Sequence, residues 1–287
     1  MKLFLVVIFC AALGLGVAWA GGQGGAEFGP VSVMLVCGAI AFGVNWLAFI
    51  PANVFQTEKY YDLTGSLTYL STVGFAAYFS QPLDLRGTIV AIMVAVWAVR
   101  LGSFLYARIK KDGKDRRFDK IKTSPMRFLM TWTIQGLWVV LTAACAFAVI
   151  TSTANVPLGL FAYVGIALWL IGFVIEVMAD EQKKAFRADP ANNGKFISTG
   201  VWAWSRHPNY FGEIVLWLGI AVMAIPVLSG PQWAVMISPI FVFVLLTRVS
   251  GVPKLEHHAN KTWGEDPAYQ AYKANTPVLM MKPPAKA

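Results

Sequence analysis

The sequence has 287 residues, of which 57% are hydrophobic and only 14% are charged, and its mean hydropathy is +0.57. This composition predicts an integral membrane protein and excludes an ordinary soluble globular domain. A net charge of +9 and an isoelectric point near 9.5 would suggest nucleic acid binding in a soluble protein. In a membrane protein the basic residues instead set the topology and meet lipid headgroups, so we expect no nucleic acid partner.

Long apolar runs mark the helices that we expect to cross the membrane. They lie at residues 3–20, 31–54, 65–80, 87–107, 127–151, 156–178, 210–228 and 232–250. Most are close to the ~20 residues that a spanning helix needs. The run at 65–80 is short and rich in Ser and Thr, so a half-buried helix that lines a cavity is an alternative there. We therefore expect an all-α polytopic membrane protein, a single domain of seven or eight transmembrane helices capped by cytoplasmic loops.

The basic residues predict which side of the membrane each loop occupies. Nine Lys or Arg lie from Arg108 to Arg127, five from Lys183 to Arg206 and five from Lys254 onwards, all on one side, whereas Arg86 falls on the other. The positive-inside rule makes the first side the cytoplasm. The first run could instead be a cleaved secretory signal, because Ala18, Trp19 and Ala20 precede a Gly-rich piece and resemble a cleavage site with small residues. Either reading places the later loops identically.

Cysteine and histidine patterns give no sign of a metal site. Cys10, Cys37 and Cys145 lie in apolar runs without C-x-x-C spacing, so we expect neither a disulfide framework nor a metal centre. His257 and His258 are adjacent, and neighbours on a helix point in different directions. The Gly-rich motifs of soluble nucleotide-binding domains are also missing from the sequence, which excludes those architectures.

A basic helix face is predicted in the run at 87–107. Trp97, Arg100, Phe104 and Arg108 recur at spacings of three and four, which places them on one face of a helix that enters a basic loop. A guanidinium as deep as that of Arg100 costs on the order of 3 kcal/mol unless it reaches the headgroups or binds an anion. We therefore predict a functional role for it. Two further basic candidates lie at the expected cytoplasmic ends of the bundle, Arg117 and Arg248.

The segment from Glu176 to Glu213 carries the richest polar pattern of the chain. If the helix through Glu176 continues, Asp180 and Arg187 fall within about 40° of it, at about 100° per residue. Asp189 and Pro190 should end that helix. The next apolar helix should then open at residues 205–209.

This pattern predicts a large anionic cofactor. The carboxylates of Glu176 and Asp180 can accept hydrogen bonds from ribose hydroxyls or a carboxamide, while Arg187 and Lys195 suit phosphates. Arg206 and His207 would stand at the positive end of the next helix, where phosphate binds well. The alternative is a helix end that emerges into water with solvated carboxylates. Glu213 is a further acid, inside the next apolar run.

The same residues resemble the steroid 5-alpha-reductase family, of the bacterial kind with the domain of unknown function 1295. The resemblance is carried by Glu176-x-x-x-Asp180, by Arg187, by the stretch S-R-H-P-N-Y-F-G-E at residues 205–213, and by the later W-G-x-x-P-x-Y of residues 263–269. It is strong from about 160 to 250, looser from 87 to 120 and weak in the first 80 residues. In that family the C-terminal half binds NADPH from the cytoplasmic side, and an enone enters among the N-terminal helices from the membrane.

The resemblance implies NADPH-dependent reduction of the C=C bond of a conjugated enone, such as a 3-oxo-4-ene steroid or a similar lipid, in a bacterial inner membrane. Residues 1–107 would form the substrate side, and residues 108–287 the cofactor half, with cytoplasmic loops 108–126 and 179–209 and the tail 251–287. Glu176 departs from the amide of the animal enzymes but can still accept hydrogen bonds. The expected cofactor-binding residues are Tyr61, Arg100, Arg108, Arg117, Glu176, Asp180, Arg187, Lys195, Trp202, Arg206, His207, Asn209, Tyr210, Glu213 and Arg248.

The groups that would activate the substrate carbonyl are harder to place. The animal enzymes use a glutamate and a tyrosine of the N-terminal half, and the position near their tyrosine holds Trp97 here. From the stretch at residues 56–69 we predict Glu58 and Tyr69 as the carbonyl-activating pair. Alternatively, this stretch closes over the cofactor, with Tyr61 stacked on it.

Two other functions stay open at this point. The pattern R-H-P-x-Y-x-G of residues 206–212 also resembles membrane methyltransferases that act on isoprenylated cysteine or phospholipid with S-adenosylmethionine. That cofactor lacks phosphates and would not need the basic set, so the charges favour NADPH. A transporter or structural membrane protein is the third reading, but charges gathered at one membrane face, not at the midplane, count against it.

Overall fold

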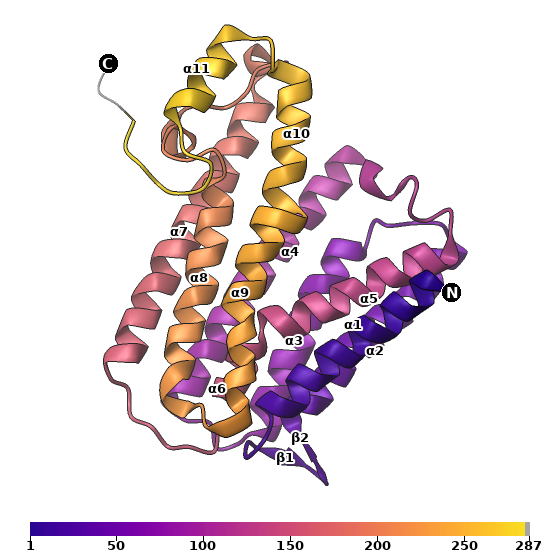
Figure 1. The fold of residues 1–287 in the computed structure, drawn as a ribbon, viewed down its shortest axis with the longest axis vertical. Helices are drawn as coiled ribbons and strands as arrows, with labels where there is room; N and C mark the ends of the chain where they lie inside the picture. Colours follow the sequence, from indigo (N-terminus) through magenta and orange to yellow (C-terminus); the bar gives the residue numbers. More distant parts are fainter. Residues whose placement is uncertain (285–287) are drawn as a thin grey trace. The chain divides into compact units, whose positions relative to one another are not determined.

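The computed structural model describes residues 1–284, apart from the side chains of residues 112 and 116, and these residues are almost entirely helical. They divide into two compact units, residues 1–162 with 223–238 (unit 1) and residues 163–222 with 239 onwards (unit 2). The elements, coloured along the chain in Figure 1, are α1 (Lys2–Gly21), β1 (Glu27–Phe28), β2 (Val31–Ser32), α2 (Val33–Val54), α3 (Tyr61–Phe79), α4 (Leu85–Asp112), α5 (Pro125–Thr142), α6 (Ala144–Ile150), α7 (Leu160–Ala188), α8 (Pro208–Ala224), α9 (Ile237–Val244), α10 (Gly251–Trp263) and α11 (Pro267–Asn275).

The expectation of a helical polytopic membrane protein is confirmed. By length and composition, six helices within residues 1–284 can cross a membrane, or seven if α5 and α6, bent by 52° at their junction, form one span. The difference from the expected seven or eight lies at residues 65–80. There the chain does form a helix, α3, but its hydroxyl side chains keep it out of the set of apolar spans.

Three threonines of α3 face the interior of unit 1. Thr64, Thr68 and Thr72 are buried, and each hydroxyl donates to the carbonyl oxygen four residues earlier, at 2.7–2.8 Å. Asn45 of α2 donates to the Thr68 hydroxyl at 3.3 Å. These local bonds satisfy the hydroxyls within the helix, so a polar stripe can be buried against a neighbouring helix.

A buried arginine holds the start of α4. The side chain of Arg86 is 1% exposed, and its guanidinium donates to the carbonyl oxygens of Pro157 and Met223, both at 2.9 Å. Asp84 caps the same helix by accepting from the Gly87 amide at 2.6 Å. From this end α4 runs for 28 residues and stops where Gly113 adopts a φ of +78°.

Unit 2 is organised by the close approach of α7 and α8, which run side by side in Figure 1. A Cβ atom placed on Gly212 would lie 2.5 Å from the carbonyl oxygen of Gly172, and one on Gly219 would lie 2.6 Å from that of Gly165. Only glycine allows two helix backbones to meet this closely. The contact brings the C-terminal half of α7 against the N-terminal half of α8.

Candidate functional site

The expected acid pair lies on one buried face of α7. The helix continues without interruption to Ala188, so Glu176 and Asp180 share a face as predicted, and they are only 3% and 7% exposed. The side-chain amide of Asn209, in the first turn of α8, donates to Asp180 Oδ1 at 3.4 Å. Arg187 lies in the last turn of α7 and is exposed. The polar stripe therefore runs from the α7–α8 contact out to solvent.

The helix ends where the sequence predicts. Asp189 adopts an extended conformation, accepts a hydrogen bond from the Ala191 amide at 2.9 Å, and starts a short 3₁₀ turn at Pro190–Asn192. Lys195 follows in the loop and is exposed. Trp263 of α10 donates its indole N–H to the Gly194 carbonyl at 2.6 Å, which ties this loop to the C-terminal helices of unit 2.

The segment before α8 is clamped onto α7. Trp202 is 3% exposed and donates its indole N–H to the carbonyl oxygen of Ala179 at 3.0 Å. Gln182 accepts from the Val201 amide at 2.9 Å, and the ammonium of Lys183 lies 4.5 Å from the centre of the Trp202 ring. The predicted site residue Trp202 is therefore packed against α7, and its indole N–H already donates a hydrogen bond to the protein.

Two basic residues share one carboxylate at the start of α8. His207 Nε2 lies 2.9 Å from Glu256 Oε1, and the Arg206 guanidinium lies 3.1 Å from Glu256 Oε2. Burial lowers the pKa of His207, while Glu256 raises it. The His207 ring also stacks on that of Tyr210, with centroids 5.7 Å apart and an interplanar angle of 12°. Both predicted phosphate-binding residues are thus fixed by an acid of α10.

The C-terminal tail completes this part of the unit. The Arg206 amide donates to the Pro277 carbonyl at 2.9 Å, and the Ser205 hydroxyl donates to the Leu279 carbonyl at 2.9 Å. The Lys282 amide donates to the Trp204 carbonyl at 3.0 Å. The tail therefore lies along residues 204–206 and holds them by their backbone.

Buried polar atoms remain unsatisfied beside these contacts. Asn209 Oδ1, His207 Nδ1 and Arg206 Nε are each shielded from solvent and have no hydrogen-bond partner among residues 1–284. A buried acceptor or donor without a partner costs roughly 1–3 kcal/mol, so these three atoms, within four residues of the chain, can each gain a hydrogen bond from a ligand or water. Two further predicted residues of unit 2 are more accessible to solvent, since Glu213 of α8 is half-buried and Arg248 is exposed.

The predicted basic residues of unit 1 are placed around the start of α3 and the end of α4. Arg108 pairs with Asp62 at 3.4 Å. Arg117 pairs with Asp115, its Nε lying 2.7 Å from Oδ2. Burial raises the pKa of Asp62, although both arginines oppose that shift. Arg100 is half-buried, with its guanidinium 5.4 Å from the Phe104 ring centre, which confirms that the two share a face of α4.

Tyr61 is packed by protein on more than one side. Its ring lies 4.9 Å from that of Phe118 and 5.0 Å from that of Trp132, and its hydroxyl donates to the Thr131 carbonyl at 3.0 Å. Burial raises its pKa. These contacts make Tyr61 a core residue that seats the loop after α4, and they use the groups that the prediction gave to a cofactor.

Glu58 and Tyr69, the predicted carbonyl-activating pair, have different surroundings in unit 1. Glu58 is 3% exposed, and its two carboxylate oxygens bind Lys122 at 2.6 Å and the Asp115 amide at 3.0 Å. Tyr69 lies eight residues into α3, about 12 Å along the helix axis from its first residue. Tyr69 is buried with its ring 5.1 Å from that of Trp97. Glu58 therefore holds the loop after α4.

Glu256 is the main residue that the site prediction missed. It lies on α10, more than forty positions after the residues that it binds, and its spacing carries no recognisable motif. A weaker signal did exist, because an adjacent Arg and His at a helix start require a nearby anion when they are buried. Gln182 and Lys183 were also missed, although they occupy the turn of α7 that follows Asp180.

The fold and these contacts define a polytopic helical membrane protein with one group of buried polar residues at the end of α7 and the start of α8. The chain belongs to the DUF1295 family of proteins of unknown function, whose family model matches residues 48–276. No solved structure matches the chain.

Curated relatives match over shorter segments. An uncharacterized protein of Schizosaccharomyces pombe is 24% identical over 163 residues, which is 46% of each chain. Mouse 3-oxo-5-alpha-steroid 4-dehydrogenase 1 is 36% identical over 58 residues, covering 20% of this chain and 23% of the mouse protein. The probable O-methyltransferase ustE of Ustilaginoidea virens is 27% identical over 97 residues, covering 34% of this chain and 32% of the fungal protein. The chain thus spans less than half the length of these relatives. The expected resemblance to the steroid 5-alpha-reductase family is confirmed at this level.

Proposed function

We propose that the protein is an NADPH-dependent membrane reductase that saturates the C=C bond of a conjugated enone in a steroid or similar lipid. The observation that carries the proposal is the group of buried polar atoms at the start of α8, which lie next to the Asp180–Asn209 pair and lack partners among the described residues. The family relatives named 3-oxo-5-alpha-steroid 4-dehydrogenase support the reaction class.

The residues of unit 2 fit such a cofactor in chemistry. Asn209 Oδ1 can accept from a hydroxyl or carboxamide, and so can His207 Nδ1, because a neutral His207 that donates from Nε2 to Glu256 carries no proton on Nδ1. The Arg206 guanidinium can donate to phosphate oxygens. The exposed Arg187 and Lys195 offer charge for a further phosphate. NADPH, when bound, supplies the hydride that adds to the β carbon of the enone.

The protein has three tasks in this reaction. Glu256 keeps Arg206 and His207 in place and neutralises part of the Arg206 charge, so that both side chains present fixed polar atoms to a ligand. The tail fixes the backbone of the same segment. We keep Tyr69 as the predicted donor to the substrate carbonyl oxygen, and we give Glu58 the positioning role that its contacts describe. The roles of Arg100, Arg108, Arg117 and Arg248, and a cytoplasmic site facing the interior of a bacterium, stay predictions.

A titration with three cofactors tests the proposal. Purified protein in neutral detergent is titrated with NADPH, NADH and S-adenosylmethionine, and the tryptophan fluorescence is followed, because Trp202 lies in the wall of the proposed site. We expect saturable quenching by NADPH, weaker quenching by NADH, and loss of that preference in Arg187→Ala. The matched control is Lys184→Ala, one turn away in an exposed ion pair with Glu181. Turnover is then measured as enone-dependent oxidation of NADPH with a 3-oxo-4-ene steroid.

The match to the fungal O-methyltransferase favours one alternative, transfer of a methyl group from S-adenosylmethionine. Tight binding of S-adenosylmethionine with no response to either nicotinamide cofactor would establish this alternative and refute the reductase. Binding of NADPH that Asp180→Ala and Asn209→Ala leave unchanged would move the cofactor away from the start of α8.

A further inference from the structure

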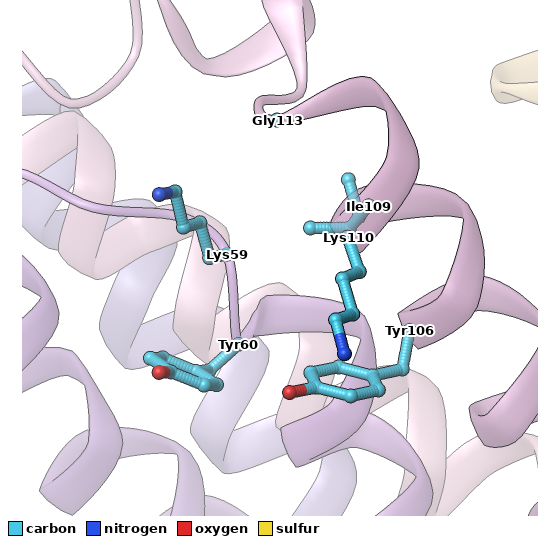
Figure 2. A pocket seen from close by; sticks show the side chains of 6 residues that line it. All are labelled: Lys59, Tyr60, Tyr106, Ile109, Lys110 and Gly113. Carbon is cyan, nitrogen blue, oxygen red and sulfur yellow. The ribbon is translucent and has the colours of Figure 1, made fainter.

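A small hollow lies between the residues that precede α3 and the end of α4, within unit 1. Its volume is about 170 Å³, and it is lined by Lys59, Tyr60, Tyr106, Ile109, Lys110 and Gly113. Figure 2 shows the two lysine side chains on opposite sides of the hollow and the two tyrosine rings beside each other at its base. None of these residues belongs to the site proposed for the cofactor.

Among the side chains that the structure describes, the hollow presents positive charge without a counter-ion. Within residues 1–284, the ammonium groups of Lys59 and Lys110 and the hydroxyls of Tyr60 and Tyr106 make no hydrogen bond or ion pair. Four acids described around the start of α3 and in the loop after α4 have basic partners, which are Arg108 for Asp62, Arg117 for Asp115, Lys114 for Asp119 and Lys122 for Glu58. The hollow therefore offers two ammonium groups to which an anion from outside can bind.

The backbone keeps this hollow open. Gly113 ends α4 with a φ of +78°, and its amide donates to the Ile109 carbonyl at 2.9 Å. Nothing lies within 4 Å of the position that a Cβ atom of Gly113 would occupy. The chain turns away from the helix axis here, so the loop after α4 leaves the hollow uncovered.

The position of the hollow along α4 indicates which anion reaches it. The apolar span of α4 runs from Leu85 to Lys111, so Tyr106 and Lys110 lie in its last two turns. Tyr60 and Tyr106 are 58% and 41% exposed. Exposed tyrosines and lysines at the end of a span are typical of the headgroup layer, where lipid phosphates are concentrated. The volume is also below the roughly 300–1,000 Å³ of pockets for drug-sized ligands, which suits a headgroup better than a whole nucleotide.

We propose that this hollow binds the phosphate of an anionic phospholipid headgroup, with Lys59 and Lys110 as the charged partners and the two tyrosine hydroxyls as donors. Binding would fasten the start of α3 to the end of α4 at the membrane surface. This proposal is independent of the proposed function, because it involves none of the residues assigned to the cofactor or the substrate.

The experiment measures lipid binding to the full chain by native mass spectrometry in neutral detergent. Phosphatidylglycerol is titrated against phosphatidylcholine, and the dissociation constant of the first bound lipid is compared between the native protein and Lys59→Ala/Lys110→Ala. Each lysine near an anionic lipid surface strengthens binding by roughly five- to six-fold, and the double variant loses two such lysines. We therefore expect it to bind phosphatidylglycerol roughly 30-fold more weakly. Tyr60→Phe/Tyr106→Phe, which keeps the rings, should weaken binding several-fold.

The controls separate this site from general attraction to a basic protein. Lys184→Ala/Lys261→Ala removes the same charge from exposed positions of unit 2 and should leave the dissociation constant unchanged. Equal weakening in both lysine double variants, or no weakening in Lys59→Ala/Lys110→Ala, would overturn the proposal. Glycerol phosphate is added as a soluble competitor. If a small molar excess displaces the lipid, the hollow binds a free phosphate and the proposal of a lipid headgroup is wrong. Circular dichroism confirms that each variant is folded.

Discussion

Replacing Gly212 by alanine should force α7 and α8 apart. The new Cβ would lie 2.5 Å from the Gly172 carbonyl oxygen and 2.7 Å from the Glu176 amide nitrogen, and both are backbone atoms that no rotamer change can move. Ordinary van der Waals contact begins near 3.4 Å, and the new Cβ would lie 2.5 Å from the carbonyl oxygen, so the two helices would have to move apart by about 0.9 Å. Overpacking of this kind costs roughly 1–3 kcal/mol, more than the ~1 kcal/mol that alanine gains over glycine in a helix.

The same separation should weaken the proposed site. The hydrogen bond from Asn209 to Asp180 already measures 3.4 Å, near the limit of a useful bond, and it joins the two helices one turn from Gly212. We therefore expect Gly212→Ala to lower the melting temperature and to weaken NADPH binding. Both are measured in detergent from tryptophan fluorescence.

Gly16→Ala is the matched control. Gly16 also lies within a helix, α1, but nothing lies within 4 Å of its Cβ position. The gain in helix propensity is the same, so the difference between the two variants isolates the contact of α7 with α8. Equal melting temperatures for the two variants would refute the steric reasoning, and a stable Gly212→Ala protein with normal NADPH binding would separate the helix contact from the site.

Three further outcomes follow from the buried charges. Glu256→Gln should lower the free energy of unfolding by roughly 1–3 kcal/mol, because Arg206 and His207 lose their shared carboxylate; an unchanged denaturant midpoint would contradict this. Since burial lowers the pKa of His207 below its usual 6.5, its neutral form stabilises the fold above that pH, and stability should fall as the pH drops below about 6.5; in His207→Gln the pH profile of the melting temperature should flatten there. Glu58→Gln should loosen the loop after α4, seen as faster cleavage by trypsin, whereas an unchanged cleavage rate would argue against its contact with Lys122 as the anchor.

The parts of the fold that depend on local chemistry were predictable from the sequence. Asp189 and Pro190 end α7 because an Asx turn and a missing amide both act within a few residues. The face shared by Glu176 and Asp180 follows from helix periodicity alone. The run at 65–80 forms a helix, α3, and its Ser and Thr residues were the reason to consider a half-buried helix there; hydroxyls bonded to their own helix can be buried.

The parts that depend on contacts between distant residues were not predictable. Glu256 reaches Arg206 and His207 only because α10 packs against the start of α8, and no spacing rule encodes that packing. Glu58 and Tyr69 are close in sequence, so a shared role looked natural. Glu58 precedes α3 and binds the loop after α4, whereas Tyr69 lies about 12 Å along the helix axis from the first residue of α3, which sequence distance does not reveal.

The tail contacts also limit when residues 204–206 can reach their final structure during folding. Ser205 is held by the carbonyl of Leu279, 74 residues later, and Arg206 by Pro277. During synthesis the start of α8 leaves the ribosome long before its partners exist, so residues 204–206 must wait with open backbone groups until the last segment arrives. A protein cut between α11 and Pro277 would have all of its apolar helices but would lose the backbone contacts that hold residues 204–206.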